Sequence, residues 1–331
     1  MSNELQRTHD CGTLSDKHIG ETVTLCGWVH TRRDHGGLIF VDLWDKYGMT
    51  QVVLNPQIDQ LAHEHAQSIR GNYVIGIVGD VRARPDDMVN QKLKTGMIEV
   101  YVDELSILNP SETPPISPWE TQDTSEALRL KYRFLDLRGP ELQRNLKMRY
   151  DITRVARNEL HRNGFMEIET PMLTKSTPEG ARDYLVPSRL NTQKFYALPQ
   201  SPQLFKQILM VSGMDRYYQI VKCFRDEDLR NDRQPEFTQI DIEMSFGNEK
   251  TLFQMTEEMI AAIYQEVLDV KIETPFPLLK YQDAIDRFGT DKPDMRFEME
   301  IVDLGEIVRG TAFKVFTQVL ESGGQVRALN I

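Results

Sequence analysis

The sequence predicts an α+β protein in which a small β-barrel and a linker precede a larger region of helices around an antiparallel sheet. Three observations support this class. The first 108 residues contain five strand-like segments, residues 109–121 contain four prolines, and residues 217–246 show two strand-like segments after a long helical pattern. A chain of 331 residues is long enough for two or three hydrophobic cores.

The element order of the first part is informative. The predicted strands lie at about 22–33, 38–45, 49–54, 72–83 and 97–108. Between the third and fourth strands, residues 55–70 predict a helix that opens at Asn55-Pro56, because proline suits the first helical position. Three strands, a helix and two strands is the order of an OB-fold, a barrel that binds oligonucleotides over its second and third strands. A generic five-stranded barrel is the alternative.

The proline-rich residues 109–121 predict a semi-rigid linker, and a basic hinge follows at residues 129–140. A long helix is expected from about Glu141 to Asn163, ended by Gly164. Its apolar stripe consists of Leu142, Leu146, Val155, Ala156 and Leu160. A strand over residues 165–170 is expected next, closed by Pro171.

Two further strands are predicted at residues 217–224 and 237–246, followed by a helix at residues 251–269. The second strand alternates Ile240, Ile242, Met244 and Phe246 with Gln239, Asp241, Glu243 and Ser245. The connection, residues 226–236, has seven charges among eleven residues and exceeds a normal hairpin turn, which favours a binding loop. Arg225 closes the first strand, and its guanidinium suits phosphate or carboxylate. A solvated surface hairpin is the alternative.

Composition excludes several classes of protein. Three widely spaced cysteines argue against a disulfide framework or a thiolate zinc site and fit a reducing cytoplasm. No apolar run is long enough for a membrane span, and the N-terminus lacks a signal-peptide core. All seven histidines precede residue 162, so a histidine-based triad in the second half is excluded. No metal site and no glycine-rich phosphate loop is predicted.

The net charge of −11 contrasts with the basic footprint typical of nucleic-acid binders. However, residues 125–157 carry nine Lys or Arg against four carboxylates. A local positive face can steer a polyanion, although charge alone favours a solvated helix face.

The segment around Arg225 resembles a known family. The sequences FRDE (224–227) and RQPEFTQ (233–239) are similar to motif 2 of class II aminoacyl-tRNA synthetases of the bacterial aspartyl type. Residues 27–53 resemble the anticodon-binding barrel of that family, and the helix–strand–proline unit resembles motif 1, which builds its homodimer interface. Residues 295–331 resemble the start of its insertion domain. A lysyl or asparaginyl enzyme is disfavoured by the motif 2 loop.

The resemblance implies four parts. These are an OB-fold anticodon-binding domain (1–108), a linker and hinge (109–140), the first part of an antiparallel-sheet catalytic domain (141–290) and the start of an inserted α+β domain (291–331).

The implied activity is a cytoplasmic aspartate–tRNA ligase that uses ATP and Mg²⁺ to form aspartyl-adenylate and charges tRNA(Asp). Whether tRNA(Asn) is a second substrate stays open. Arg225 is the implied catalytic residue. The implied ATP contacts are Arg225, Asp226, Glu227, Gln234 and Phe237. The implied aspartate contacts are Glu179, Ser201, Gln203, Lys206, Arg225 and Asp241. The implied anticodon contacts are Arg33, His35, Phe40 and Gln51.

Nothing after Phe246 matches motif 3, which in the family clamps the ATP γ-phosphate, and most of the family's metal site is expected beyond Ile331. This portion of the catalytic domain is therefore expected to show negligible aspartate-dependent ATP–pyrophosphate exchange alone. The alternative function is a non-catalytic fragment or paralogue that binds tRNA or dimerises.

Overall fold

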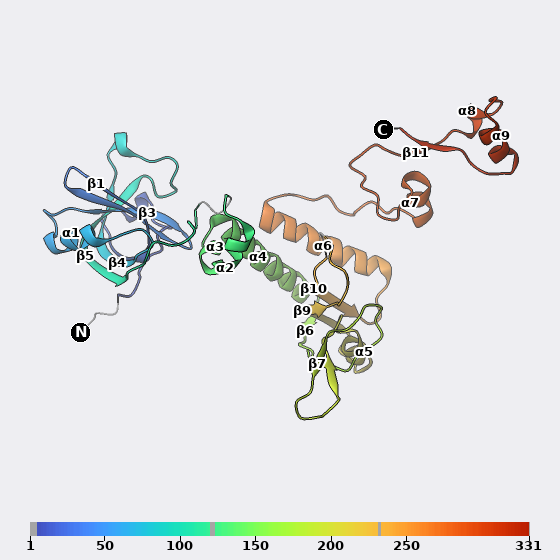
Figure 1. The fold of residues 1–331 in the computed structure, drawn as a ribbon, viewed down its shortest axis with the longest axis horizontal. Coiled ribbons are helices and arrows are strands. Elements are labelled where there is room, and N and C mark those ends of the chain that lie inside the picture. The colour runs from blue at the N-terminus through green and yellow to red at the C-terminus, as the bar shows by residue number, and fades with distance from the viewer. Residues whose placement is uncertain (1–4, 120–122, 231–232, 331) are drawn as a thin grey trace. The chain divides into compact units, whose positions relative to one another are not determined.

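The computed structural model describes residues 5–119, 123–230 and 233–330 (Figure 1). The chain divides into two compact units, Met1–Arg149 and Tyr150–Ile331. None of the helices in the described ranges is long and apolar enough to cross a membrane.

The first unit contains a closed five-stranded barrel with strand order β1-β2-β3-β5-β4. The strands are β1 (Thr22–His35), β2 (Leu38–Asp45), β3 (Gly48–Leu54), β4 (Val74–Ala83) and β5 (Ile98–Asn109). Short 3₁₀ turns lie at η1 (Asp16–His18) and η2 (Asp86–Met88). All five predicted strands are confirmed, and the closed barrel with its single helix between β3 and β4 confirms the OB-fold.

The barrel interior is apolar because alternate residues of every strand point inward. Leu25, Ile39, Val52, Ile77 and Val100 are fully buried members of this core. The helix α1 (Gln60–Ser68) packs Ala62 and Ala66 against it.

The predicted start of this helix was wrong. Asp59 is the N-cap, with its Oδ1 accepting from the Ala62 amide at 2.5 Å. The Asn55 carbonyl instead accepts from the amides of Ile58 and Asp59, so Asn55-Pro56 belong to a turn. The aspartate side chain accepts a hydrogen bond from a helix amide that would otherwise be unpaired, whereas the side chain of Pro56 has no acceptor.

The segment after the barrel packs onto it through aromatic side chains. Trp119 lies edge-on to His30 and Trp44, with ring centroids 4.3 Å and 4.7 Å away, and Trp44 contacts Trp28 at 5.6 Å. The Arg138 guanidinium stands 4.8 Å from the centre of the Trp28 ring. The predicted linker is therefore attached to the barrel at Trp119; its residues 120–122 lie outside the described residues.

The predicted basic hinge is helical. It forms α2 (Glu126–Lys131) and α3 (Arg133–Asp136). The fully buried Asp136 accepts from Arg129 at 2.9 Å and from Arg133. Part of the positive charge in this segment is therefore neutralised within it, by a buried carboxylate and not on the solvated helix face that charge alone favoured.

His30 makes the stability of this unit dependent on pH. Burial lowers the pKa of His30, with a smaller opposing effect from Asp42, and the buried Nδ1 has no partner in the described part of the chain. The unfolded chain then binds the proton more readily, so stability is lost as pH falls from about 6.5, the ordinary histidine pKa, through the lower folded value. We expect His30→Phe to weaken this acid loss in urea unfolding followed by tryptophan fluorescence. The exposed His35→Gln is the control and should keep it.

Helix α4 (Pro140–Arg162) begins within the first unit and ends within the second, as predicted at Gly164, which has φ +78°. The Phe165 amide donates to the Leu160 carbonyl at 2.9 Å and closes the helix end. Val155, Ala156 and Leu160 are buried, as the stripe predicted. Leu142 is only half-buried and Leu146 is 52% exposed, so the first half of the stripe is not core in this chain.

The main sheet has the order β10-β9-β6. β9 (Arg216–Phe224) and β10 (Glu236–Met244) are antiparallel, and β6 (Met166–Glu167) runs parallel to β9. The predicted strand at 165–170 was too long, because only Met166 and Glu167 pair with β9, and the Ile168 amide makes one further bond, to the Tyr218 carbonyl at 3.2 Å.

Helix α6 (Glu249–Leu268) covers the apolar face of this sheet (Figure 1). Its Met255 and Met259 belong to one cluster with Ile240, Ile242 and Met244 of β10. Phe246 was predicted to share this face, but it lies beyond the strand with φ +56° and is fully exposed.

The remaining elements are short. They are β7 (Leu185–Pro187), β8 (Phe195–Ala197), α5 (Gln203–Val211), α7 (Tyr281–Phe288), β11 (Ile301–Asp303), α8 (Gly305–Val308), α9 (Lys314–Glu321) and β12 (Arg327–Leu329). β7 pairs with β8 and β11 with β12, both antiparallel.

Candidate functional site

Polar side chains gather on the face of β9 and β10 opposite α6. The register places Tyr217 opposite Glu243 and Gln219 opposite Asp241. Because side chains alternate along a strand, these four share one face while Ile240 and Ile242 occupy the other. Two buried hydroxyls hold this face in place, since Thr170 and Tyr217 both donate to Gln219 Oε1, at 2.9 Å and 3.0 Å.

A buried ion pair stands at the centre of this face. Lys206 of α5 is only 9% exposed, and its Nζ lies 2.8 Å from Asp241 Oδ1 and 3.5 Å from Glu243 Oε2. The other oxygen of Asp241, Oδ2, is buried without a hydrogen-bond partner among the described residues. One cation therefore faces two carboxylates, which leaves negative charge and a free acceptor for a further positive group. Gln203 lies one turn before Lys206 on the same helix.

Cys223 belongs to the same face. Burial, and then the negative charge of Asp241, raise the pKa of the Cys223 thiol to about 11. It is protonated at neutral pH and donates to Gln239 Oε1 at 3.2 Å.

The loop after β9 forms a second group. The Arg225 amide donates to the Pro235 carbonyl at 2.8 Å, and its guanidinium lies 5.2 Å from the centre of the Phe237 ring. Arg225 Nε is buried without a partner among the residues described. The loop lines a cavity of about 330 Å³. It is separate from a cavity of about 490 Å³ beside Glu179. That smaller cavity is lined by Arg225, Glu227, Asp228, Leu229, Arg233, Gln234, Pro235 and Phe237.

Asp226 points to a neighbouring hollow of about 610 Å³ that it shares with Gly180, Glu227 and Arg233. The loop residues Asn231 and Asp232 lie outside the described residues.

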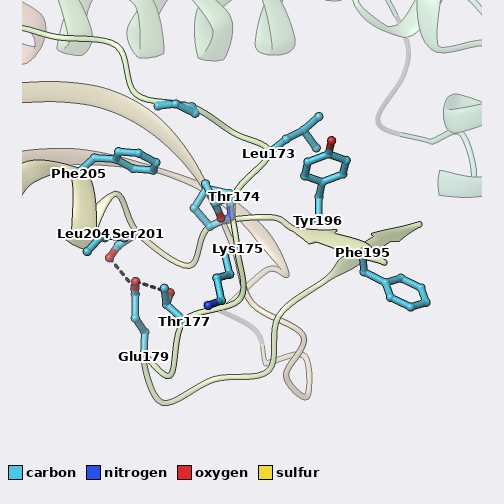
Figure 2. A pocket seen from close by; sticks show the side chains of 12 residues that line it. Leu173, Thr174, Lys175, Thr177, Glu179, Phe195, Tyr196, Ser201, Leu204 and Phe205 are labelled. Carbon is cyan, nitrogen blue, oxygen red and sulfur yellow. Dashed lines mark hydrogen bonds between the residues drawn. The ribbon is translucent and has the colours of Figure 1, made fainter. Parts of the chain in front are cut away.

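The third group surrounds Glu179, whose carboxylate accepts from the Ser201 hydroxyl at 2.8 Å and from the Thr177 hydroxyl at 3.0 Å (Figure 2). It borders the cavity of about 490 Å³ together with Lys175 and Phe205.

The barrel carries a separate polar face. Arg33 forms a bidentate pair with Asp42 at 2.8 Å and 2.9 Å and also donates to Gln51 at 3.3 Å. Phe40 is half-buried opposite Arg33 in the β1–β2 register. The structure thus brings Arg33, Phe40 and Gln51 together, whereas His35 lies exposed at the end of β1.

Sequence reasoning missed several polar residues that complete these groups. On the barrel, Gln51 donates to the buried Glu99 at 2.9 Å. Nearby Arg84 is buried, its pKa is lowered by that burial, and its Nη2 has no partner in the described ranges. On the sheet the missed residues are Tyr217, Gln219 and Cys223. Their alternation with Tyr218, Ile220 and Lys222 was visible in the sequence.

Two protein-family models match the chain. Residues 125–319 match the model of the tRNA synthetases class II (D, K and N), and residues 23–108 match that of the OB-fold nucleic acid binding domain. The chain belongs to the class II tRNA synthetases. The barrel lies within the OB-fold match, and the β9–β10 sheet lies within the synthetase match.

Several curated relatives are named aspartate–tRNA(Asp/Asn) ligase, and one is named aspartate–tRNA ligase. The chain is 59% identical over 326 residues to an aspartate–tRNA(Asp/Asn) ligase of Desulfotalea psychrophila, covering 98% of this chain and 54% of the relative. It is 56% identical over 330 residues to the ligase of that name from Desulfatibacillum aliphaticivorans, covering 100% and 55%. The chain therefore spans about half the length of the curated relatives it matches.

Solved structures share the fold of this class II synthetase. Asparaginyl-tRNA synthetase from Pyrococcus horikoshii, complexed with asparaginyl-adenylate, matches with a TM-score of 0.69 at 23% identity, covering 80% of this chain and 59% of that chain. A putative aspartyl-tRNA synthetase from Leishmania major matches with a TM-score of 0.69 at 20% identity, covering 81% and 54%.

The ion pair of this synthetase should dominate the stability of its second unit. Lys206→Met leaves two carboxylates beside each other without their buried cation, so we expect a loss of about 3–5 kcal/mol in urea unfolding. Combining it with Asp241→Asn should recover part of this loss. Lys222→Met removes an exposed lysine from the same sheet and should cost at most about 1 kcal/mol. Equal losses for the two single variants would contradict a special role for Lys206.

Proposed function

We propose that the chain is the aspartate- and ATP-binding portion of an aspartate–tRNA ligase that forms aspartyl-adenylate and charges tRNA(Asp). The observation that carries the proposal is the buried Lys206–Asp241 pair. Lys206 lies one turn after Gln203 on α5, and Asp241 lies on β10, the strand paired with β9, which ends just before Arg225. It supplies one cation for a side-chain carboxylate and anions for an ammonium group, as aspartate requires. The names of the relatives at 55–59% identity support the same substrate.

The chemistry places few demands on the protein. The α-carboxylate of aspartate attacks the α-phosphate of ATP, a P–O bond forms, and pyrophosphate leaves with the electrons of the broken P–O bond. The nucleophile is already ionised, so neither a base nor a covalent nucleophile is needed. Holding two anions together and neutralising their charge is the main task.

Arg225 has the free donor for this task, because its buried Nε lacks a partner in the part of the chain described. We assign it to both the α-phosphate and the reacting carboxylate, since a guanidinium binds two acceptors at once. Phe237, beside it, offers a ring face to adenine. Glu227 and Gln234 line the same cavity, and Asp226 the neighbouring one.

Mg²⁺ would accompany the ATP phosphates and offset their charge. In the described ranges no group of three or more His, Cys, Asp or Glu side chains is placed to hold a metal ion.

For aspartate, Lys206 would bind the side-chain carboxylate. The ammonium would lie among Asp241, Glu179 and the side chains of Ser201 and Gln203. Moving Lys206 toward the substrate would take its charge away from Asp241 and Glu243, and the substrate ammonium would replace that charge beside the two carboxylates.

The barrel face would bind the anticodon of tRNA(Asp), and of tRNA(Asn) if the name of the relatives applies. Phe40 offers a ring for stacking, and Arg33 and Gln51 offer donors to base edges. His35, at the end of β1, would contact the neighbouring nucleotide. A cytoplasmic homodimer through α4 completes the proposal, supported by the exposed Leu146 on that helix.

Binding of aspartyl sulfamoyl adenosine, a stable adenylate mimic, tests the substrate. We expect calorimetry to show at least tenfold tighter binding than to the asparaginyl or lysyl mimic. Arg225→Gln should weaken binding by about 10–100-fold, the range for a hydrogen bond to a charged group. Lys222→Met is the matched control, since it removes an exposed cation three residues away, on the strand that ends just before Arg225. A preference for the lysyl or asparaginyl mimic would reject the aspartate assignment.

The tRNA face can be tested independently. Phe40→Ala should weaken binding of a tRNA(Asp) anticodon stem-loop by about 1–3 kcal/mol, the typical value of one base stacked on an aromatic ring. Filter binding at fixed salt measures this, and Tyr47→Ala, an exposed aromatic of the β2–β3 turn, is the control. Intact tRNA binding without any adenylate binding would favour the alternative of a non-catalytic tRNA-binding protein.

A further inference from the structure

Gln200 holds the segment that carries Glu179. Its side-chain amide bonds to both backbone groups of Ala181: Oε1 accepts from the Ala181 amide at 3.0 Å, and Nε2 donates to the Ala181 carbonyl at 2.9 Å. The second hydrogen of Nε2 points to Asp183 Oδ1 at 2.5 Å. Gln200 is 3% exposed, and both of its donors are used. It therefore acts on residues 181–183 as a neighbouring β-strand would, although no strand is present there.

Gln200 is itself firmly placed. The preceding Pro199 carbonyl accepts from the Phe224 amide of β9 at 3.0 Å, and the Leu198 amide donates to the Tyr184 carbonyl at 2.9 Å. The next residue, Ser201, donates to Glu179. Two consecutive side chains thus hold the loop, one through its backbone and one through the carboxylate expected to meet the substrate.

The held segment also connects the two halves of the site. The Asp226 amide donates to the Arg182 carbonyl at 3.0 Å, directly after Arg225. Gly180 precedes the held residues with φ +104°, a conformation that residues with a side chain rarely adopt. The backbone bends at this glycine and is fixed immediately afterwards at Ala181.

We propose that Gln200 is a positioning residue that fixes residues 176–183 so that Glu179 meets the ammonium of the bound amino acid. This inference rests on the proposed function for the identity of the ligand, but the clamp itself does not. Glutamine is required at this place because only a side-chain amide of this length both donates and accepts. A glutamate would set a carboxylate oxygen against the Ala181 carbonyl and Asp183.

Hydrogen–deuterium exchange of the ligand-free chain tests the clamp. We expect Gln200→Glu to speed exchange of peptides covering 176–183 by about tenfold or more, and to speed trypsin cleavage after Arg182 correspondingly. Gln200→Met, of similar length but without the amide, should do the same if the charged variant does not fold. Gln207→Glu is the matched control, because Gln207 is an exposed glutamine on α5.

A rescue distinguishes a specific clamp from general loosening. Asp183→Asn supplies an amide that can donate to the carboxylate introduced by Gln200→Glu, and its oxygen can still accept from Ser176. The double variant should therefore exchange more slowly than Gln200→Glu alone. Unchanged exchange over 176–183 in both Gln200 variants, or no slowing in the double variant, would overturn the proposal.

The ligand is tested separately with aspartyl sulfamoyl adenosine. The mimic should slow exchange of residues 176–183 in the unmodified chain, and Gln200→Met should weaken its binding by about tenfold while ATP binding changes less than threefold. An equal loss for ATP would overturn the positioning role. If the unmodified chain does not bind the mimic, the proposed function fails, whereas the exchange result without ligand still decides the clamp.

Discussion

The buried Lys206–Asp241 ion pair is the constraint on which the rest of the site depends. Removing two charges from water is costly, and that cost is offset only when geometry and neighbouring hydrogen bonds are good. The sheet provides this geometry, because the β9–β10 register sets Gln219 opposite Asp241 and Tyr217 opposite Glu243. The opposite face is packed on α6, so the polar face cannot exchange with the apolar one without a shift in register.

Two buried polar atoms of the site have no hydrogen-bond partner among the described residues. They are Asp241 Oδ2 and Arg225 Nε. An unmet acceptor and an unmet donor each carry a free-energy cost, which a ligand with an ammonium group and a carboxylate would remove. The free-energy cost of these two unpaired atoms in the ligand-free protein would thus favour binding of a ligand that carries both charges.

Much of this was predictable, and the failures have specific causes. Alternation and turn residues located all five barrel strands and the β9–β10 pair, because short-range patterns determine them. The prediction that the helix starts at Asn55-Pro56 was wrong because Asp59 is the N-cap. The prediction that Phe246 lies on the apolar strand face was wrong because the strand ends two residues earlier. Arg225, Phe237 and Gln234, named by the resemblance, line one cavity, and their roles stay predictions. Gln200 and Glu99 were not predicted, since their partners lie 19 and 48 residues away and no local pattern marks such pairs.

The Arg33–Asp42 pair has a consequence for how an acidic protein distinguishes one polyanion from others. A guanidinium that is already neutralised by a neighbouring carboxylate attracts few phosphates, so a nucleic acid meeting this face releases few counterions. In the proposed function, non-specific binding of RNA to this face would therefore be weak, and tRNA binding would depend on stacking and on base edges that only a suitable loop presents. The net charge of −11 over these 331 residues would likewise give little long-range attraction of a polyanion, so selectivity would have to come from contacts at close range.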